Sequence, residues 1–353
     1  MKQNIFGMTQ DELQTILAPF GLPPFRAKQI AVWLYRKYAT DFAVMTDLSK
    51  SLRELLAANF SVTTAEILRE LRSADDTTSK FLLRLAEDAD VETVLMRHDY
   101  GNSLCVSTQI GCPVGCRFCA SSLNGFIRNL TTGEILAQVN FANQYLQKDG
   151  QKVDSIVIMG MGEPLLNYDN VLKFIRLLHE PYAANLSYRN ITLSTSGIVP
   201  NIYRLANENI PVNLAISLHA PFDELRSKIM PINRKFPLTE VVKAGKFYEN
   251  KTKRRVTYEY ILLNEINDGS DNAQALAKLL KGQLANVNII PFNGVAEREF
   301  AAPTTAKISA FLHILTKKNG IAATLRREMG ADVNAACGQL RNRSKTNRAG
   351  CVE

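Results

Sequence analysis

The feature that most constrains the fold is an alternation, after residue 100, of apolar β-rich runs with amphipathic helical patterns such as NVLKFIRLLH and TTAKISAFLHILTKK. The β-rich runs lie at 104–110, 153–159, 190–195, 212–218, 255–263, 286–290 and 321–326. Strands separated by helices form right-handed βαβ units, which build a mainly parallel sheet or barrel. Because six or seven strands are fewer than the eight of a closed (β/α)8 barrel, the pattern predicts an α/β fold with an open, partial (β/α)6 TIM-type barrel.

Two regions precede this barrel and a tail follows it. Helical spacing of apolar residues, with a Thr9 cap and a break at GLPPF, predicts a helical accessory domain over 1–62. The runs KFLLRLA and VETVLMRH, set among polar turns, predict a small β extension over 63–100. The barrel is then expected over 101–341, and the polar, basic residues 342–353 form a flexible tail.

The pattern of apolar residues also bears on location. The sequence has no stretch of roughly 18 uninterrupted apolar residues, and MKQNIFGMTQDELQ lacks the apolar centre of a signal peptide. We therefore expect a cytoplasmic protein with no membrane partner. In a reducing compartment, clustered cysteines are more often ligands or reactive thiols than structural disulfides.

Positive charge predicts an affinity for polyanions. The net charge is +8, and the basic residues gather in three clusters: Lys251, Lys253, Arg254 and Arg255; Arg341, Arg343, Lys345 and Arg348; and Arg26, Lys28, Arg36 and Lys37. The third cluster lies beside Trp33 and Tyr35, which could stack on RNA bases. The alternative is a solvated helix face whose aromatic side chains belong to the core.

Chemically distinctive residues follow several of the expected strands. A cysteine triplet, GMGEP (160–164), STSG (194–197), His219 and PFN (291–293) each come directly after one of the β-rich runs. The carboxyl ends of parallel strands meet at one edge of a barrel, where such folds build their sites. We therefore expect one cavity to collect these residues.

The triplet Cys112, Cys116 and Cys119 has the spacing C-x3-C-x2-C, one thiol short of a closed metal site. Three thiolates can hold three irons of a cubane cluster and leave the fourth iron open. A Cys3His zinc site is disfavoured because no histidine lies nearby, and a redox dithiol needs only two thiols.

The segment from Gly111 to Cys119, followed by NLT, resembles the cluster loop of radical S-adenosylmethionine enzymes, and specifically of the RlmN/Cfr family of RNA adenosine methyltransferases. The resemblance continues through MGMGEPLLN, STSGIVP, AISLHAP, ELRSKIMPINRK, IIPFN and ACGQLR, and so covers most of the chain from about 90 to 341. Agreement along this length favours the RlmN branch over the Cfr branch.

The resemblance implies a [4Fe-4S] cluster on Cys112, Cys116 and Cys119, with S-adenosylmethionine completing the open iron. The positions that match residues meeting this cofactor in the family are Gly162, Glu163, Ser194, Ser217, Leu218, His219 and Asn293. Glycine permits close approach of the backbone, and carboxylate and amide side chains suit an ammonium group and a ribose.

Two further cysteines match the reactive pair of the family. By resemblance, Cys337 takes a methyl group from one S-adenosylmethionine, and a second is cleaved to a 5′-deoxyadenosyl radical that removes a hydrogen from this methyl. The methylene radical adds to adenine, and Cys105 resolves the adduct by forming a disulfide with Cys337. Glu92 matches the proton acceptor of the family, although either Glu92 or Cys105 could remove the C2 proton, and an exposed strand glutamate is the alternative.

These resemblances predict a methyltransferase that acts on C2 of an adenosine in 23S rRNA and in some tRNAs. The expected partners are these RNAs and an electron donor such as flavodoxin or ferredoxin, and we expect a monomer that uses two S-adenosylmethionines per turnover. One alternative is methylation at C8, as in Cfr; another is a non-enzymatic RNA-binding protein with a structural cysteine-metal knot. Cys351 has no match and is interpreted as a free tail thiol.

Overall fold

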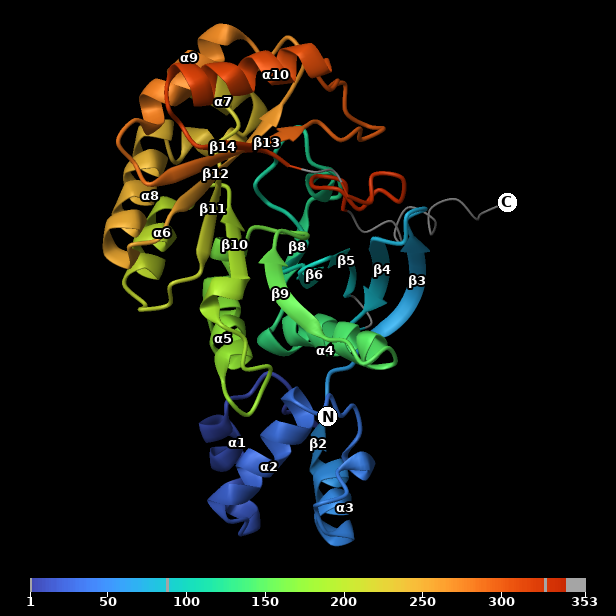
Figure 1. Ribbon diagram of the computed structural model, residues 1–353. Helices are drawn as coiled ribbons and strands as arrows, with labels where there is room; N and C mark the ends of the chain where they lie inside the picture. The colour runs from blue at the N-terminus through green and yellow to red at the C-terminus, as the bar shows by residue number, and fades with distance from the viewer. Residues whose placement is uncertain (1, 87–88, 327–328, 341–353) are drawn as a thin grey trace.

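The structure is a computed structural model that describes residues 2–86, 89–326 and 329–340. Within these ranges its main feature is a ten-stranded sheet, in the order β14-β13-β12-β11-β10-β9-β6-β5-β4-β3 (Figure 1). Because β14 and β3 are the two edges and do not pair with each other, the sheet stays open. The predicted tail at 342–353, with Cys351, lies outside the described residues, as does the basic cluster that begins at Arg341.

One side of the sheet is parallel and forms the partial barrel. Its seven described strands are β6 (Gly101–Cys105), β9 (Val153–Ile158), β10 (Ile191–Thr195), β11 (Asn213–Ser217), β12 (Val256–Leu262), β13 (Ala285–Pro291) and β14 (Ala323–Leu325). The predicted open α/β barrel is confirmed, and the six crossovers between these strands account for the (β/α)6 description.

The prediction of one strand at 104–110 was wrong in one respect, because this segment divides into two strands. β6 ends at Cys105, and β7 (Gln109–Gly111) pairs antiparallel with β8 (Phe126–Asn129) in a separate hairpin. The residues between them turn toward the loop that follows β9, where the Thr108 N–H donates to the Met161 carbonyl at 2.9 Å. An apolar run shows that a segment is buried, but it does not show where the segment changes its pairing partner.

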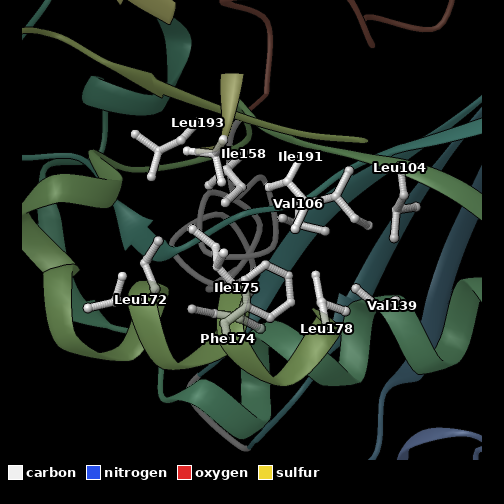
Figure 2. Packing of buried hydrophobic residues seen from close by; sticks show 14 of the residues in the cluster. Leu104, Val106, Val139, Ile158, Leu172, Phe174, Ile175, Leu178, Ile191 and Leu193 are labelled. Atoms are coloured by element: carbon white, nitrogen blue, oxygen red, sulfur yellow. The ribbon is translucent and has the colours of Figure 1, made fainter. Parts of the chain in front are cut away.

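Helices cover the parallel part of the sheet. They are α4 (Thr132–Gln147), α5 (Tyr168–His179), α6 (Val199–Ala206), α7 (Asp223–Ile229), α8 (Leu238–Thr252), α9 (Ser270–Leu280) and α10 (Thr305–His313), which continues as a π-helical segment, Ile314–Lys318. Figure 2 shows the layer between strands and helices, where Leu104, Ile158 and Ile191 face Phe174 and Leu178 of α5. This packed layer fixes the strands, so that their carboxyl ends form a rigid rim.

The three antiparallel strands continue the barrel sheet. β3 (Glu66–Arg72), β4 (Thr78–Arg84) and β5 (Asp90–His98) form a meander, and β5 pairs with β6 so that Val94 lies opposite Cys105. The predicted β extension is therefore joined directly to the first barrel strand.

The N-terminal helices pack beside α4 and α5 (Figure 1). This module contains α1 (Gln10–Leu17), α2 (Pro24–Tyr35), α3 (Lys50–Asn59) and a parallel pair, β1 (Gln3–Asn4) and β2 (Phe60–Ser61). The predicted Thr9 cap is confirmed, as part of a capping box with Glu12. The Asn140 side chain of α4 donates to the Leu34 carbonyl at 2.8 Å, which ties α2 to the barrel.

Of the two aromatic residues considered for stacking, Tyr35 belongs to the core, whereas Trp33 is half-buried. Tyr35 is 2% exposed, and its hydroxyl accepts from the Gly7 N–H and donates to the Met8 carbonyl. Trp33 is half-buried, and the Lys37 ammonium lies 3.6 Å from its ring centroid. Tyr35 therefore cannot stack on RNA in this arrangement. None of the helices in the described part of the chain is both long and apolar enough to cross a bilayer.

Candidate active site

A cavity of about 150 Å³ lies at the carboxyl ends of the parallel strands. Its lining includes the three clustered cysteines and residues at or just after the carboxyl ends of successive strands: Cys112, Cys116, Cys119, Gly162, Glu163, Ser194, Ser196, Ser217 and His219. The structure thus brings together most of the residues expected from the strand ends. Two are placed elsewhere: Leu218 is fully buried in the core, and Asn293 lines a neighbouring cavity.

The cysteine loop is held by its own backbone and by the chain that follows it. The Cys112 N–H donates to the Gly125 carbonyl at 3.2 Å, and Gly111, with φ +73°, passes so close to Gly125 that any side chain there would collide with it. Burial raises the pKa of the Cys112 thiol to about 12 and that of Cys116 well above its usual value. Both thiols therefore need a nearby positive charge to become thiolates.

The three clustered thiols line one cavity. Among the described residues, no group of three or more Cys, His, Asp and Glu side chains has an arrangement suited to one metal ion. Three thiolates can hold three irons of a cubane cluster and leave the fourth iron open, so these side chains supply the ligands that such a cluster would need.

Glu163 is fixed at the end of β9 by backbone donors. Its carboxylate accepts from the Leu165 N–H at 3.0 Å and the Ser196 N–H at 2.6 Å, and burial raises its pKa. The preceding Gly162 has φ +102°, and a Cβ there would lie 2.5 Å from the Gln109 side chain. Glycine therefore lets this loop pass over β7 and turn the carboxylate toward the cavity.

His219 follows β11 in a left-handed conformation, with φ +60°. Its Nδ1 accepts from the Ile261 N–H at 3.0 Å, and burial, together with the charge of Arg226, lowers its pKa to about 3. The imidazole is therefore neutral near pH 7, and its remaining proton is on Nε2. A ring that lines the cavity with Nε2–H can donate a hydrogen bond to a polar ligand.

A second, larger cavity of about 580 Å³ adjoins the first. Cys105 lines the second cavity, and four residues line both: Met159, Ile290, Arg326 and Cys337. Cys105 and Cys337 are free thiols, so the structure shows no disulfide between them. Burial, followed by the charge of Cys337, raises the pKa of Cys105 to about 12. Cys337 therefore stands in the wall between the cysteine-lined cavity and the cavity that holds Cys105.

Comparisons with known proteins agree along nearly the whole chain. Residues 3–62 match the ribosomal RNA large subunit methyltransferase N-terminal domain, and residues 106–277 match the radical SAM superfamily. A probable dual-specificity RNA methyltransferase RlmN of Symbiobacterium thermophilum is 50% identical over 350 residues, which cover 99% of this chain and 94% of the relative. A relative of the same name from Geobacillus kaustophilus is 50% identical over 342 residues, covering 97% and 93%.

A solved structure extends this agreement to three dimensions. The radical SAM methyltransferase of Sphaerobacter thermophilus superposes with a TM-score of 0.93 at 45% identity, covering 96% of this chain and 99% of that chain. The chain belongs to the RlmN family of radical SAM RNA methyltransferases.

Membership of the RlmN family implies a [4Fe-4S] cluster, S-adenosylmethionine and an RNA substrate. The residues of the first cavity fit the two cofactors: it offers three thiols and the neutral donor His219. It also offers the Ser196 hydroxyl, which lies beside the Glu163 carboxylate.

In this RlmN-family chain, Glu92 is buried and forms an ion pair with Lys80. It is 5% exposed, which excludes an exposed strand glutamate. The Lys80 ammonium on the neighbouring strand lies 3.2 Å from the Glu92 carboxylate and also donates to the Asn334 carbonyl at 3.0 Å. Glu92 is not among the residues that line either cavity, although the pleat of β5 puts it on the same face as Val94, opposite Cys105.

Two arginines of the site, Arg226, which is fully buried, and Arg326, which is partly exposed, were missed by sequence reasoning. Arg226 is 0% exposed and donates to four neutral acceptors: the carbonyls of Ser196, Ser217 and Leu218 and the amide oxygen of Asn233. Burial lowers its pKa to about 10, which leaves it charged at neutral pH beside Cys116. Arg326 lies in the wall with Cys337, whose charge raises the pKa of this arginine. The motif ELRSKIMPINRK contained Arg226, but only the fold shows which strand ends it joins.

Proposed function

We propose that this RlmN-family chain methylates C2 of an adenosine in 23S rRNA and in some tRNAs, with Cys337 as the carrier of the methyl group. The observation that carries the proposal is the position of Cys337 in the wall shared by the two cavities. A residue in that position can meet the cofactors on one side and an RNA base on the other.

Cys112, Cys116 and Cys119 would hold the cluster, and Glu163, Ser196 and His219 would bind the polar groups of S-adenosylmethionine. Gly162, Ser194 and Ser217 complete this side of the cavity, and Asn293 donates to the Cys337 carbonyl at 3.3 Å from the other. Leu218 positions the cofactor site through its carbonyl, which accepts from Arg226 at 3.0 Å. When bound, the cluster and two S-adenosylmethionines per turnover supply a methyl group and carbon-radical chemistry.

Cys337 and Cys105 would carry out the covalent steps of the proposed methylation reaction. The Cys337 thiolate attacks the sulfonium methyl, forming an S–CH3 bond and releasing S-adenosylhomocysteine. Once the carbon of this methyl is bonded to the RNA, the Cys105 thiolate attacks the Cys337 sulfur. An S–S bond forms, the C–S bond to the RNA breaks, and its electron pair goes to the former methylene carbon, which takes a proton to become the methyl group. A thiol reductant then reduces the disulfide.

The second cavity would receive the target adenosine after it leaves its base stack. Cys105, at the end of β6 beside β5, lines this cavity together with Cys337, so an adenine that reaches Cys337 would also come within range of the resolving thiol. Glu92 is the proposed acceptor of the C2 proton. Its carboxylate is ion-paired with Lys80, and it lies on the same face of β5 as Val94, which lines the second cavity opposite Cys105. An electron donor such as flavodoxin or ferredoxin would supply the electron that the cleavage of S-adenosylmethionine to its radical requires.

The proposal is tested by reconstituting the enzyme without oxygen and mapping the methyl group on 23S rRNA by mass spectrometry. We expect about four irons per chain, which depend on the three cysteine ligands. We also expect methyl on C2 of adenosine, which depends on S-adenosylmethionine. The control Cys337→Ala should keep its iron and transfer no methyl. Methyl on C8 alone would overturn the assignment in favour of the Cfr-type reaction, and bound zinc with no methylation would favour an RNA-binding protein with a metal knot.

A further inference from the structure

An aromatic pair at the hairpin of β5 and β6 is not used by the proposed chemistry: His98 ends β5, and Tyr100 lies in the turn that follows. Tyr100 is 80% exposed. Its ring stacks on His98 with centroids 4.6 Å apart and planes only 7° from parallel. Because Tyr100 stays so exposed while one face lies on His98, its other face is open. The pair forms a flat platform on a hairpin that the barrel sheet holds through β5 and β6.

This platform lies at the second cavity. His98 and Tyr100 line it together with the thiols of Cys105 and Cys337. Cys105 is 8% exposed, whereas Tyr100 is 80% exposed, so the thiol marks the floor of the cavity and the ring marks its mouth. A base that reaches the thiols has passed the platform, and the nucleotide joined to it must remain near the mouth.

We propose that the Tyr100–His98 platform binds, by stacking, the unpaired base next to the target adenosine. The inference rests on the proposed function, because it requires an RNA base in the second cavity. Stacking on an aromatic ring is available to any base, so the platform would hold the flipped-out strand open without selecting its sequence.

The charges around the platform indicate that Tyr100 would contribute to RNA binding by stacking and not by attraction to phosphates. Arg97 precedes His98, Asp99 lies between His98 and Tyr100, and both line the cavity, so their opposite charges offset each other next to the platform. The Arg97 guanidinium is also engaged by the β-meander, where it donates to the Ser79 hydroxyl at 3.0 Å. The contribution of Tyr100 to RNA affinity should therefore change little with salt, unlike contacts made to phosphates.

The test compares Tyr100→Ala with Tyr100→Phe in the reconstituted holoenzyme. The dissociation constant is measured at low and high salt for an RNA stem-loop that contains the target adenosine. We expect Tyr100→Ala to raise this constant roughly 5- to 150-fold at both salt concentrations, and Tyr100→Phe to stay within about twofold of the parent because it keeps the ring. Leu284→Ala is the matched control, since Leu284 is also exposed but precedes β13 at the opposite end of the barrel strands.

A fluorescent base gives a second readout. With 2-aminopurine beside the target adenosine, binding to the parent and to Tyr100→Phe should quench the fluorescence, and binding to Tyr100→Ala should leave it bright. Unchanged affinity and unchanged quenching in Tyr100→Ala would overturn the platform while the parent still methylates C2. An affinity loss that vanishes at high salt would also overturn it, because that result indicates a phosphate contact. A parent enzyme that transfers no methyl would instead overturn the proposed function.

Discussion

The two cavities that share Cys337 are built in opposite ways. The first is small and lined by groups whose hydrogen bonds and charges are fixed: the Glu163 carboxylate accepts from two backbone donors, and Arg226 behind the wall joins three carbonyls and an amide. The second has nearly four times the volume, and its mouth carries the exposed ring of Tyr100.

The difference matches what each cavity would bind. Cofactors of constant shape can use a rigid set of polar partners, and preorganised groups cost no rearrangement when the ligand binds. An RNA strand arrives in a different conformation from the one in which it reacts, and it needs space and a surface for stacking. The comparison predicts that changes in the first cavity abolish cofactor binding, whereas changes in the second act on RNA.

The largest expected effect is loss of the cluster from the first cavity. Cys116→Ser should reduce iron from about four per chain to near zero and abolish methylation, because serine does not replace a thiolate as an iron ligand. Iron and sulfide analysis with the visible spectrum measures this change. The matched control is Cys105→Ser in the second cavity, which should keep the brown colour; a Cys105→Ser protein without iron would remove the distinction between the cavities.

The next effect isolates the second cavity. Cys105→Ala should retain the cluster but stop after the adduct has formed, because no thiol remains to attack the Cys337 sulfur. A covalent protein–RNA species should then accumulate and migrate slowly on a denaturing gel. The double variant Cys105→Ala/Cys337→Ala should give no such species, and normal turnover by the single variant would show that another group resolves the adduct.

The parts of the molecule differed in how far the sequence could predict them. The barrel strands and the cysteine triplet follow from local patterns, such as the apolar run at 153–159 and the spacing of Cys112, Cys116 and Cys119. The partners of Glu92 and Arg226 do not, because Lys80 lies on another strand and the acceptors of Arg226 come from three separate segments of the chain. Such contacts depend on which strands pair with each other, and the local sequence pattern does not show this pairing.

The smallest effect concerns stability and compares the buried Arg226 with the partly exposed Arg326. Arg226→Met should lower the free energy of unfolding by about 2–4 kcal/mol, because it leaves buried carbonyl acceptors of the first cavity without a donor. Arg326→Met should cost about 1 kcal/mol or less, since this side chain is 27% exposed and its nearest carboxylate, that of Glu259, is 4.0 Å away. Urea unfolding of the apoproteins measures both changes without the cluster. Equal losses of unfolding free energy in the two variants would mean that the wall between the cavities is as rigid as the first cavity itself. The contrast between a fixed cofactor site and an adaptable RNA site would then apply only to the mouth of the second cavity, around Tyr100.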